Sequence, residues 1–238
     1  MKKRIWELDA LRGFCVLCMV IIHFVFDLVE LYALVQWDYP GWFSFVKEWG
    51  GILFLLISGI SVTLGSRSVR RGILVFLCGM VCTAVTYVMY RMNMADKGIM
   101  IYFGALHCLG VCMILWPLFR KLPAWALGAL GAAIVAVGFW TMFRPFPVGL
   151  WLMPLGLVPE TFISSDYFPL LPYLGFFLLG AVIGKTVYRE KKSLFPNVNE
   201  RNVAVRFLKL CGKHSLWIYL IHQPLLSALF YGIVLLRG

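Results

Sequence analysis

Residues 11–33 read LRGFCVLCMVIIHFVFDLVELYA, a run in which apolar side chains dominate. About 20 helical residues cross the hydrocarbon core of a bilayer, because each residue rises ~1.5 Å along the helix. The run is too long for the apolar part of a secretory signal, and no small-residue cleavage site follows it. It therefore predicts a first transmembrane helix that the mature chain retains.

The composition extends this prediction to the whole chain. The 238 residues are 61% hydrophobic and 14% charged, with a mean hydropathy of +0.85, whereas soluble domains carry roughly 25% charged residues. A soluble enzyme, a disordered chain and a disulfide-rich secreted domain are thereby excluded. We expect an all-α, polytopic transmembrane helix bundle of about seven crossings, organised as a single domain over residues 1–238. The first predicted crossing is residues 11–33, and the other six are 43–65, 72–91, 99–119, 123–143, 167–187 and 215–236.

The basic residues indicate the orientation of this bundle. With the N-terminus inside, 17 of the 22 Lys and Arg residues fall on the cytoplasmic side, as the positive-inside rule requires. We therefore expect a multi-pass protein of the cell (inner) membrane with a cytoplasmic N-terminus and an outside C-terminus. The net charge of +11 then reflects orientation and contact with anionic lipids in the bilayer, and we expect no nucleic-acid partner. Prolines within 150–158 and 167–173 predict an irregular or re-entrant piece.

Ionisable side chains within a crossing mark functional candidates, because each costs ~2.5–3.5 kcal/mol on insertion scales. His23 and Asp27 lie four residues apart, one turn from each other on one helix face. A carboxylate beside an imidazole stabilises the imidazolium, and this pair suits a general base that takes a proton from a hydroxyl or amine. The alternative is a polar pair that holds helices together.

Other polar residues also allow two interpretations. Arg12, about 16 Å below His23 along the helix, either binds a phosphate or extends to the lipid phosphates. His107, and His222 with Gln223, are either core residues bonded to neighbouring helices or functional contacts to a ligand. The Cys15–Cys18 pair lies in an apolar helix without a second pair, so we expect no metal site.

The order of several motifs resembles a known group of membrane enzymes. Glu7-Leu-Asp-Ala-Leu-Arg-Gly13, with ten residues between Arg12 and the following His23, resembles the opening of the acyltransferase-3 family. Further stretches are more similar to bacterial proteins with a heparan-alpha-glucosaminide N-acetyltransferase catalytic domain. These stretches are LLISGIS (55–61), FGALHCLG (103–110), DYFPLLPYLGFFLLG (166–180) and GKHSLWIYLIHQP (212–224).

This resemblance implies an acyltransferase with acetyl-CoA, or another acyl-CoA, as its cytoplasmic donor. The acceptor is expected to be a hydroxyl or amine of an envelope sugar or other small molecule, and a homodimer is left open. Arg12 and His23 correspond to the signature pair. His107, and His222 with Gln223, would then be contacts to the bound donor, where a histidine polarises the thioester carbonyl. The lysosomal relative has an active histidine in the loop after its first helix, where residues 36–42 have none, so His23 would have to replace it. Two alternatives stay open: a transporter or flippase that uses the same buried charges, and an inactive partner subunit.

Overall fold

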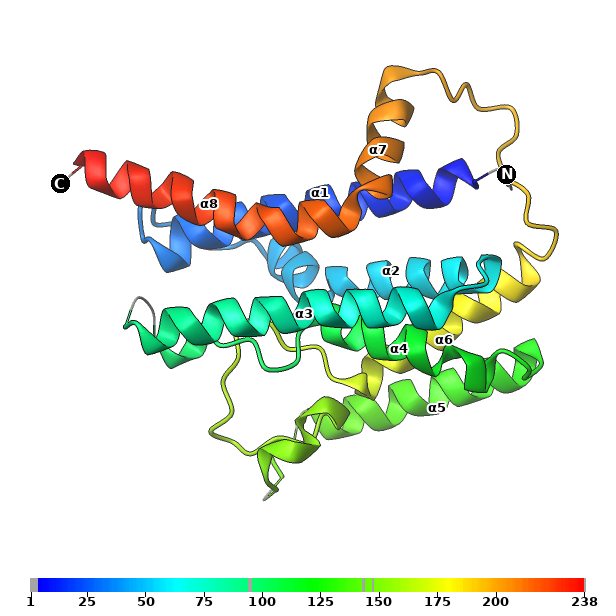
Figure 1. Ribbon diagram of the computed structural model, residues 1–238, viewed down its shortest axis with the longest axis horizontal. Coiled ribbons are helices and arrows are strands. Elements are labelled where there is room, and N and C mark those ends of the chain that lie inside the picture. The colour runs from blue at the N-terminus through cyan, green and yellow to red at the C-terminus, as the bar shows by residue number, and fades with distance from the viewer. Residues whose placement is uncertain (1–3, 94–95, 143, 147, 238) are drawn as a thin grey trace. The chain divides into compact units, whose positions relative to one another are not determined.

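The computed structural model describes residues 4–93, 96–142, 144–146 and 148–237. Every regular element within them is helical, apart from an isolated bridge between Phe103 and Tyr167. Figure 1 shows the elements along the chain. They are α1 (Trp6–Phe26), η1 (Asp27–Leu31), α2 (Gly41–Leu64), α3 (Ser68–Arg91), η2 (Lys97–Ile99), α4 (Ala105–Phe119), α5 (Ala124–Met142), η3 (Leu150–Leu155), α6 (Leu170–Thr186), α7 (Val203–Lys213) and α8 (Ser215–Arg237).

The expected all-helical class is confirmed for the described residues, and each of the seven predicted segments contains a helix. In this part of the chain, four helical stretches are long and apolar enough to cross a membrane: α1 continued by η1, α3, α5 and α8. The helix α2 is a fifth if its two parts, bent by 43°, form one span. The apolar helices α4 and α6 are shorter, with 15 and 17 residues. The count of seven crossings and the orientation of the termini stay predictions, and Gly238 lies outside the described residues.

The chain divides into two compact units. Unit 1 contains Met1–Phe54 and Lys192–Gly238, and unit 2 contains Leu55–Lys191. The organisation of residues 1–238 as a single domain stays a prediction.

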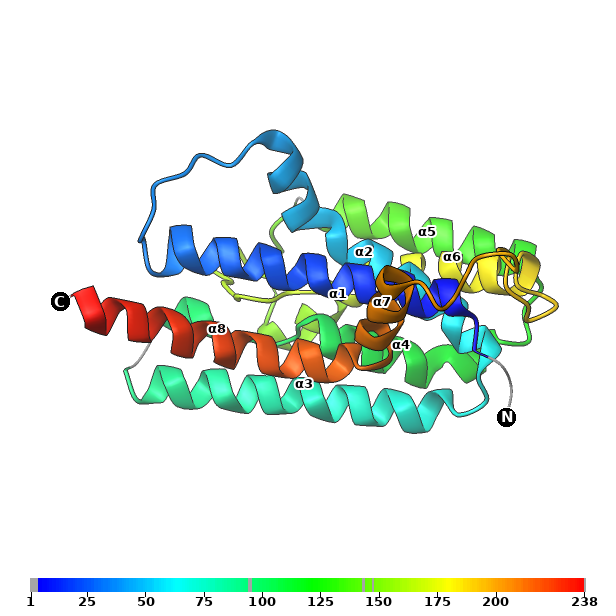
Figure 2. The ribbon, with the colours of Figure 1, turned by 90° about the horizontal axis from the view of Figure 1, so that it is seen from above.

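Unit 1 is built on α1 and α8, which lie side by side and run in the same direction, while α7 crosses α1 (Figures 1 and 2). The crossing depends on two glycines: a Cβ on Gly13 would meet the backbone of Leu208, and one on Gly212 would meet the carbonyl of Asp9. Small residues at a helix crossing let the backbones approach closely.

The helix α7 is an element that the sequence analysis did not predict. It has 11 residues, too few to cross a membrane. Its N-terminus is capped by Asn202, whose side chain accepts a hydrogen bond of 2.9 Å from the amide of Ala204, a standard helix-start signal. Val203 and Phe207, one turn apart, are exposed, so α7 presents an apolar stripe between basic side chains.

Unit 2 packs its helices in pairs through glycines. Gly72 and Gly110 bring α3 against α4, and Gly131 and Gly175 bring α5 against α6; Figure 2 shows α5 and α6 side by side. Among the described residues after α5, the 3-10 turn η3 and extended chain precede α6. The predicted irregular piece is thus confirmed through Pro169, and non-helical backbone also occurs at Leu171 inside α6.

Candidate active site

A buried polar contact joins the end of α1 to α8 in unit 1. Asp27, at the change from α1 to the π-helix η1, is 0% exposed. Its two carboxylate oxygens accept hydrogen bonds of 3.1 and 3.0 Å from Nε2 of Gln223. A buried carboxylate is costly unless it is hydrogen-bonded, so this contact is needed to place Asp27 where it lies. The Oε1 atom of Gln223 is buried and has no hydrogen-bond partner in the described part of the chain.

Two histidines meet beside this contact. The rings of His23 on α1 and His222 on α8 pack edge to face, with centroids 4.9 Å apart. The Nδ1 atom of His222 lies 2.6 Å from the backbone carbonyl of Tyr219. Because a carbonyl only accepts, Nδ1 carries the proton and Nε2 carries the lone pair. This Nε2 atom is buried and unpartnered among the described residues, so it is an acceptor available to a substrate or to the neighbouring ring.

Aromatic residues cover the cluster on the side towards the end of α8. Phe230, 1% exposed, packs against Phe24 and stacks on Tyr32. The hydroxyl of Tyr32 donates to the carbonyl of Ser227 at 3.3 Å. These contacts join α1 and the residue after η1 to α8 through apolar packing.

The structure modifies the expected relation of His23 and Asp27. Their side chains make no hydrogen bond to each other in the described structure, because the carboxylate of Asp27 turns to the amide of Gln223 instead. The sequence analysis placed Gln223 only as a donor contact and missed its partnership with Asp27. Spacing along one helix contains no signal for a partner on another helix.

Comparison with known families identifies the chain. The sequence model described as "Heparan-alpha-glucosaminide N-acetyltransferase, catalytic" matches residues 4–224. The chain belongs to this family. No match was found among curated proteins or among solved structures.

Membership in the heparan-alpha-glucosaminide N-acetyltransferase catalytic family implies transferase activity, with acetyl as the transferred group. Family membership and the apolar helices together indicate a multi-pass membrane protein. The matched region includes all six residues that the sequence analysis placed in the site.

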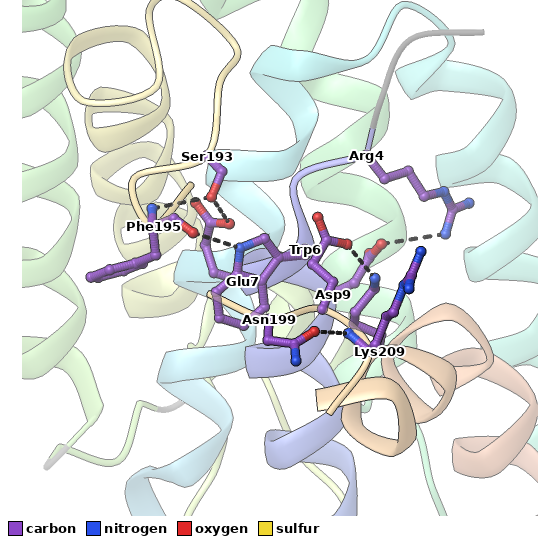
Figure 3. Close-up of polar contacts among 10 residues, drawn as sticks. Arg4, Trp6, Glu7, Asp9, Ser193, Phe195, Asn199 and Lys209 are labelled. Atoms are coloured by element: carbon purple, nitrogen blue, oxygen red, sulfur yellow. Dashed lines mark hydrogen bonds and ion pairs between the residues drawn. The ribbon is translucent and has the colours of Figure 1, made fainter. Parts of the chain in front are cut away.

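In this member of the family, Arg12 lies in a polar network at the start of α1. Its Nη1 atom donates to Asp9 at 3.2 Å, and Asp9 also pairs with Arg4 at 3.6 Å. Figure 3 shows Arg4 and Asp9 of this network beside Glu7, which accepts from the hydroxyl of Ser193 at 2.8 Å. The Arg12 side chain is 16% exposed. Its guanidinium is thus held in place by Asp9, and donor binding by Arg12 stays a prediction.

His107 belongs to unit 2 and has a different environment from the other two histidines. Its Nδ1 accepts from the amide of Gly104 at 3.2 Å, and its Nε2 lies 3.3 Å from Oγ1 of Thr83. Both ring nitrogens therefore have partners, and the first of these bonds closes the N-terminal turn of α4. A role of His107 in donor binding stays a prediction, and it would require His107 to give up one of these bonds.

Val29 of η1 and residues of the following loop, Trp37 among them, line a cavity of about 580 Å³. Nearby, Lys47 pairs with Glu30 at 2.6 Å. Burial raises the pKa of Tyr39 to about 12, so its hydroxyl stays protonated at neutral pH. The loop that lacks the histidine of the lysosomal relative is thus hollowed and aromatic.

Proposed function

We propose that the chain is an acyl-CoA-dependent acyltransferase that moves an acetyl group to a hydroxyl or amine of an envelope sugar or other small molecule. The observation that carries the proposal is the pair of His23 and His222, with the lone pair of His222 Nε2 buried and unpartnered among the described residues. A buried polar atom without a partner costs ~1–3 kcal/mol. Such an atom is typical of a site that waits for a ligand or a proton.

The proposed chemistry assigns one step to each histidine. The acceptor oxygen or nitrogen attacks the thioester carbonyl carbon, and His23 removes its proton. The carbon–sulfur bond then breaks, and the leaving CoA thiolate takes up that proton. His222 Nε2 accepts a hydrogen bond from the other ring nitrogen of His23, and so orients it. Asp27 acts through Gln223, which follows His222 on α8, and is therefore a positioning residue in this scheme.

The two substrates are proposed to approach from opposite ends of α1. Acetyl-CoA binds from the cytoplasmic side of the cell membrane, with Arg12 as one contact to its phosphates, because a guanidinium pairs well with phosphate. The donor's thioester reaches the histidine pair, with Gln223 Oε1 as a further candidate contact. The acceptor enters through the cavity lined by Trp37, a residue that is 43% exposed and whose ring suits stacking on a sugar face.

The test is an acetyl-transfer assay on the full chain, purified in detergent, with labelled acetyl-CoA and a panel of amino and hydroxyl sugars. General-base catalysis contributes about 10²–10⁴-fold. We therefore expect His23→Gln and His222→Gln each to lose at least about 100-fold in kcat. His214→Gln is the matched control, because His214 is exposed and lies outside the pair.

Three results would contradict parts of the scheme. Wild-type turnover in His23→Gln would refute the base assignment. Unchanged CoA affinity in Arg12→Ala, measured by calorimetry, would refute the donor contact. A wild-type chain that consumes no acyl-CoA with any acceptor would refute the transferase itself and favour a transporter.

A further inference from the structure

A second cavity lies within unit 2, and no histidine is among its described lining residues. Its volume is about 410 Å³, and it is lined where α2, α4 and α6 end and α3 begins. Figures 1 and 2 show these four helix ends at the same side of unit 2. Ligand pockets typically have volumes of ~300–1,000 Å³, so the space admits a small organic ligand or a headgroup.

The lining of this cavity is basic. It contains Arg120, Lys185, Arg189 and Lys191, and no acidic side chain among its described lining residues. Lys185 is partly engaged, because its ammonium donates to the carbonyls of Arg120 at 2.8 Å and Leu122 at 2.5 Å. These bonds neutralise the carbonyl end of α4, where an anion would otherwise be repelled.

The start of α3 adds an independent source of positive potential. The helix has 24 residues, and no side chain caps its first turn. Ser66 and Ser68, at this start, line the cavity. Unpaired amides at a helix N-terminus, together with the helix dipole, favour a phosphate. Trp116 and Tyr188 are buried and form the aromatic part of the lining.

We propose that this cavity binds a phosphate group of a ligand that also carries an organic part. Two sources share this chemistry: the 3′,5′-ADP portion of the acyl-CoA donor and the headgroup of an anionic lipid. The first source rests on the proposed function, whereas the second does not. Basic pockets between membrane helices bind the headgroups of anionic lipids, and a guanidinium pairs equally well with the phosphate of a nucleotide.

The test uses the full chain in nanodiscs and two probes. One probe is 3′,5′-ADP, titrated by calorimetry into nanodiscs of phosphatidylcholine. The other is phosphatidylglycerol, whose retention is measured by native mass spectrometry after extraction from an equal mixture with phosphatidylcholine. The cavity variant is Arg120→Gln/Arg189→Gln. Its control, Arg91→Gln/Arg144→Gln, removes two positive charges elsewhere in unit 2.

A lost charge-assisted contact weakens binding by about tenfold or more. We expect the cavity variant to lose at least about tenfold in affinity for one probe, and the control to lose less than about threefold. Loss for 3′,5′-ADP assigns the nucleotide, and loss for phosphatidylglycerol assigns the lipid. Unchanged binding of both probes in the cavity variant would overturn the proposal.

A second variant keeps the test decisive if the double variant does not fold. Ser68→Asp places a carboxylate in the first turn of α3, where it stabilises the helix but repels phosphate. It should weaken binding of the same probe, and unchanged binding of both probes to this variant would also overturn the proposal.

Acetyl transfer from acetyl-pantetheine, a donor that lacks the nucleotide, separates the cavity proposal from the proposed transferase activity. If the nucleotide is the ligand, cavity variants keep wild-type rates with this donor and raise KM only for acetyl-CoA. If the wild-type chain transfers acetyl from neither donor, the proposed transferase activity is refuted. The two binding assays would still test the cavity proposal, because they do not depend on activity.

Discussion

Replacing Gln223 by Leu removes the hydrogen-bond donor of a fully buried carboxylate. Asp27 is 0% exposed and accepts from Gln223 with both oxygens. Breaking a buried charged contact from one side costs ~3–5 kcal/mol, and ~1–3 kcal/mol if the remaining group is neutral. We expect Gln223→Leu to lower the free energy of unfolding by about 3 kcal/mol. This value lies where the range for a charged Asp27 meets the range for a neutral one.

The double variant Asp27→Leu/Gln223→Leu should recover most of this loss. Replacing both partners by apolar groups is nearly neutral, because no polar group is then left unsatisfied. The cycle, completed by Asp27→Leu alone, should therefore give a coupling energy of at least about 2 kcal/mol, well above the ~0.6 kcal/mol average for polar pairs between membrane helices. A matched control is Gln36→Leu, since Gln36 is exposed and should change stability by less than ~0.5 kcal/mol.

The measurement is reversible unfolding of the full chain in mixed micelles, followed by circular dichroism. A coupling energy below ~0.5 kcal/mol would mean that the two sites act independently. That result would refute the assignment of Asp27 as a carboxylate held by Gln223, and with it the positioning role of this contact in the proposed reaction.

Two further predictions concern the same unit. Gly212→Val should cost about 1–3 kcal/mol by overpacking, because a Cβ there meets the carbonyl of Asp9; Gly232→Ala, which meets nothing within 4 Å, should keep wild-type thermal stability. Asn197→Cys should react with an impermeant maleimide in lysed cells and stay unlabelled in intact cells, against the background of the parent chain. Ready labelling in intact cells would overturn the predicted orientation.

The helices of the bundle could be predicted because their signal is local. A long apolar run such as 72–91 must be helical in lipid, where each backbone polar group needs an internal partner. The helix α7 gave no such signal, since it is short and its apolar residues alternate with Arg and Lys. Its N-cap, Asn202, was the sequence feature that could have revealed it.

The site could be predicted only in part, because its contacts join distant parts of the chain. Spacing placed His23 and Asp27 on one helix face. However, the partner of Asp27 is 196 residues away in sequence, and the partner of the His23 ring is on the same distant helix. The basic cavity of unit 2 likewise forms from four helix ends that no motif connects.

The sequence left two interpretations open for the polar residues of α1, a catalytic base or a contact that holds helices together. In the structure, the carboxylate of Asp27 has the contacts expected of a residue that joins helices, whereas His222 Nε2 does not. The carboxylate of Asp27 has its donors, as a helix-joining contact requires. His222 Nε2 has no partner among the described residues. A residue that served only to join helices would have both nitrogens satisfied, as His107 does in unit 2. Because an unpartnered buried nitrogen lowers stability, its position beside the His23 ring supports the catalytic role proposed for the histidine pair.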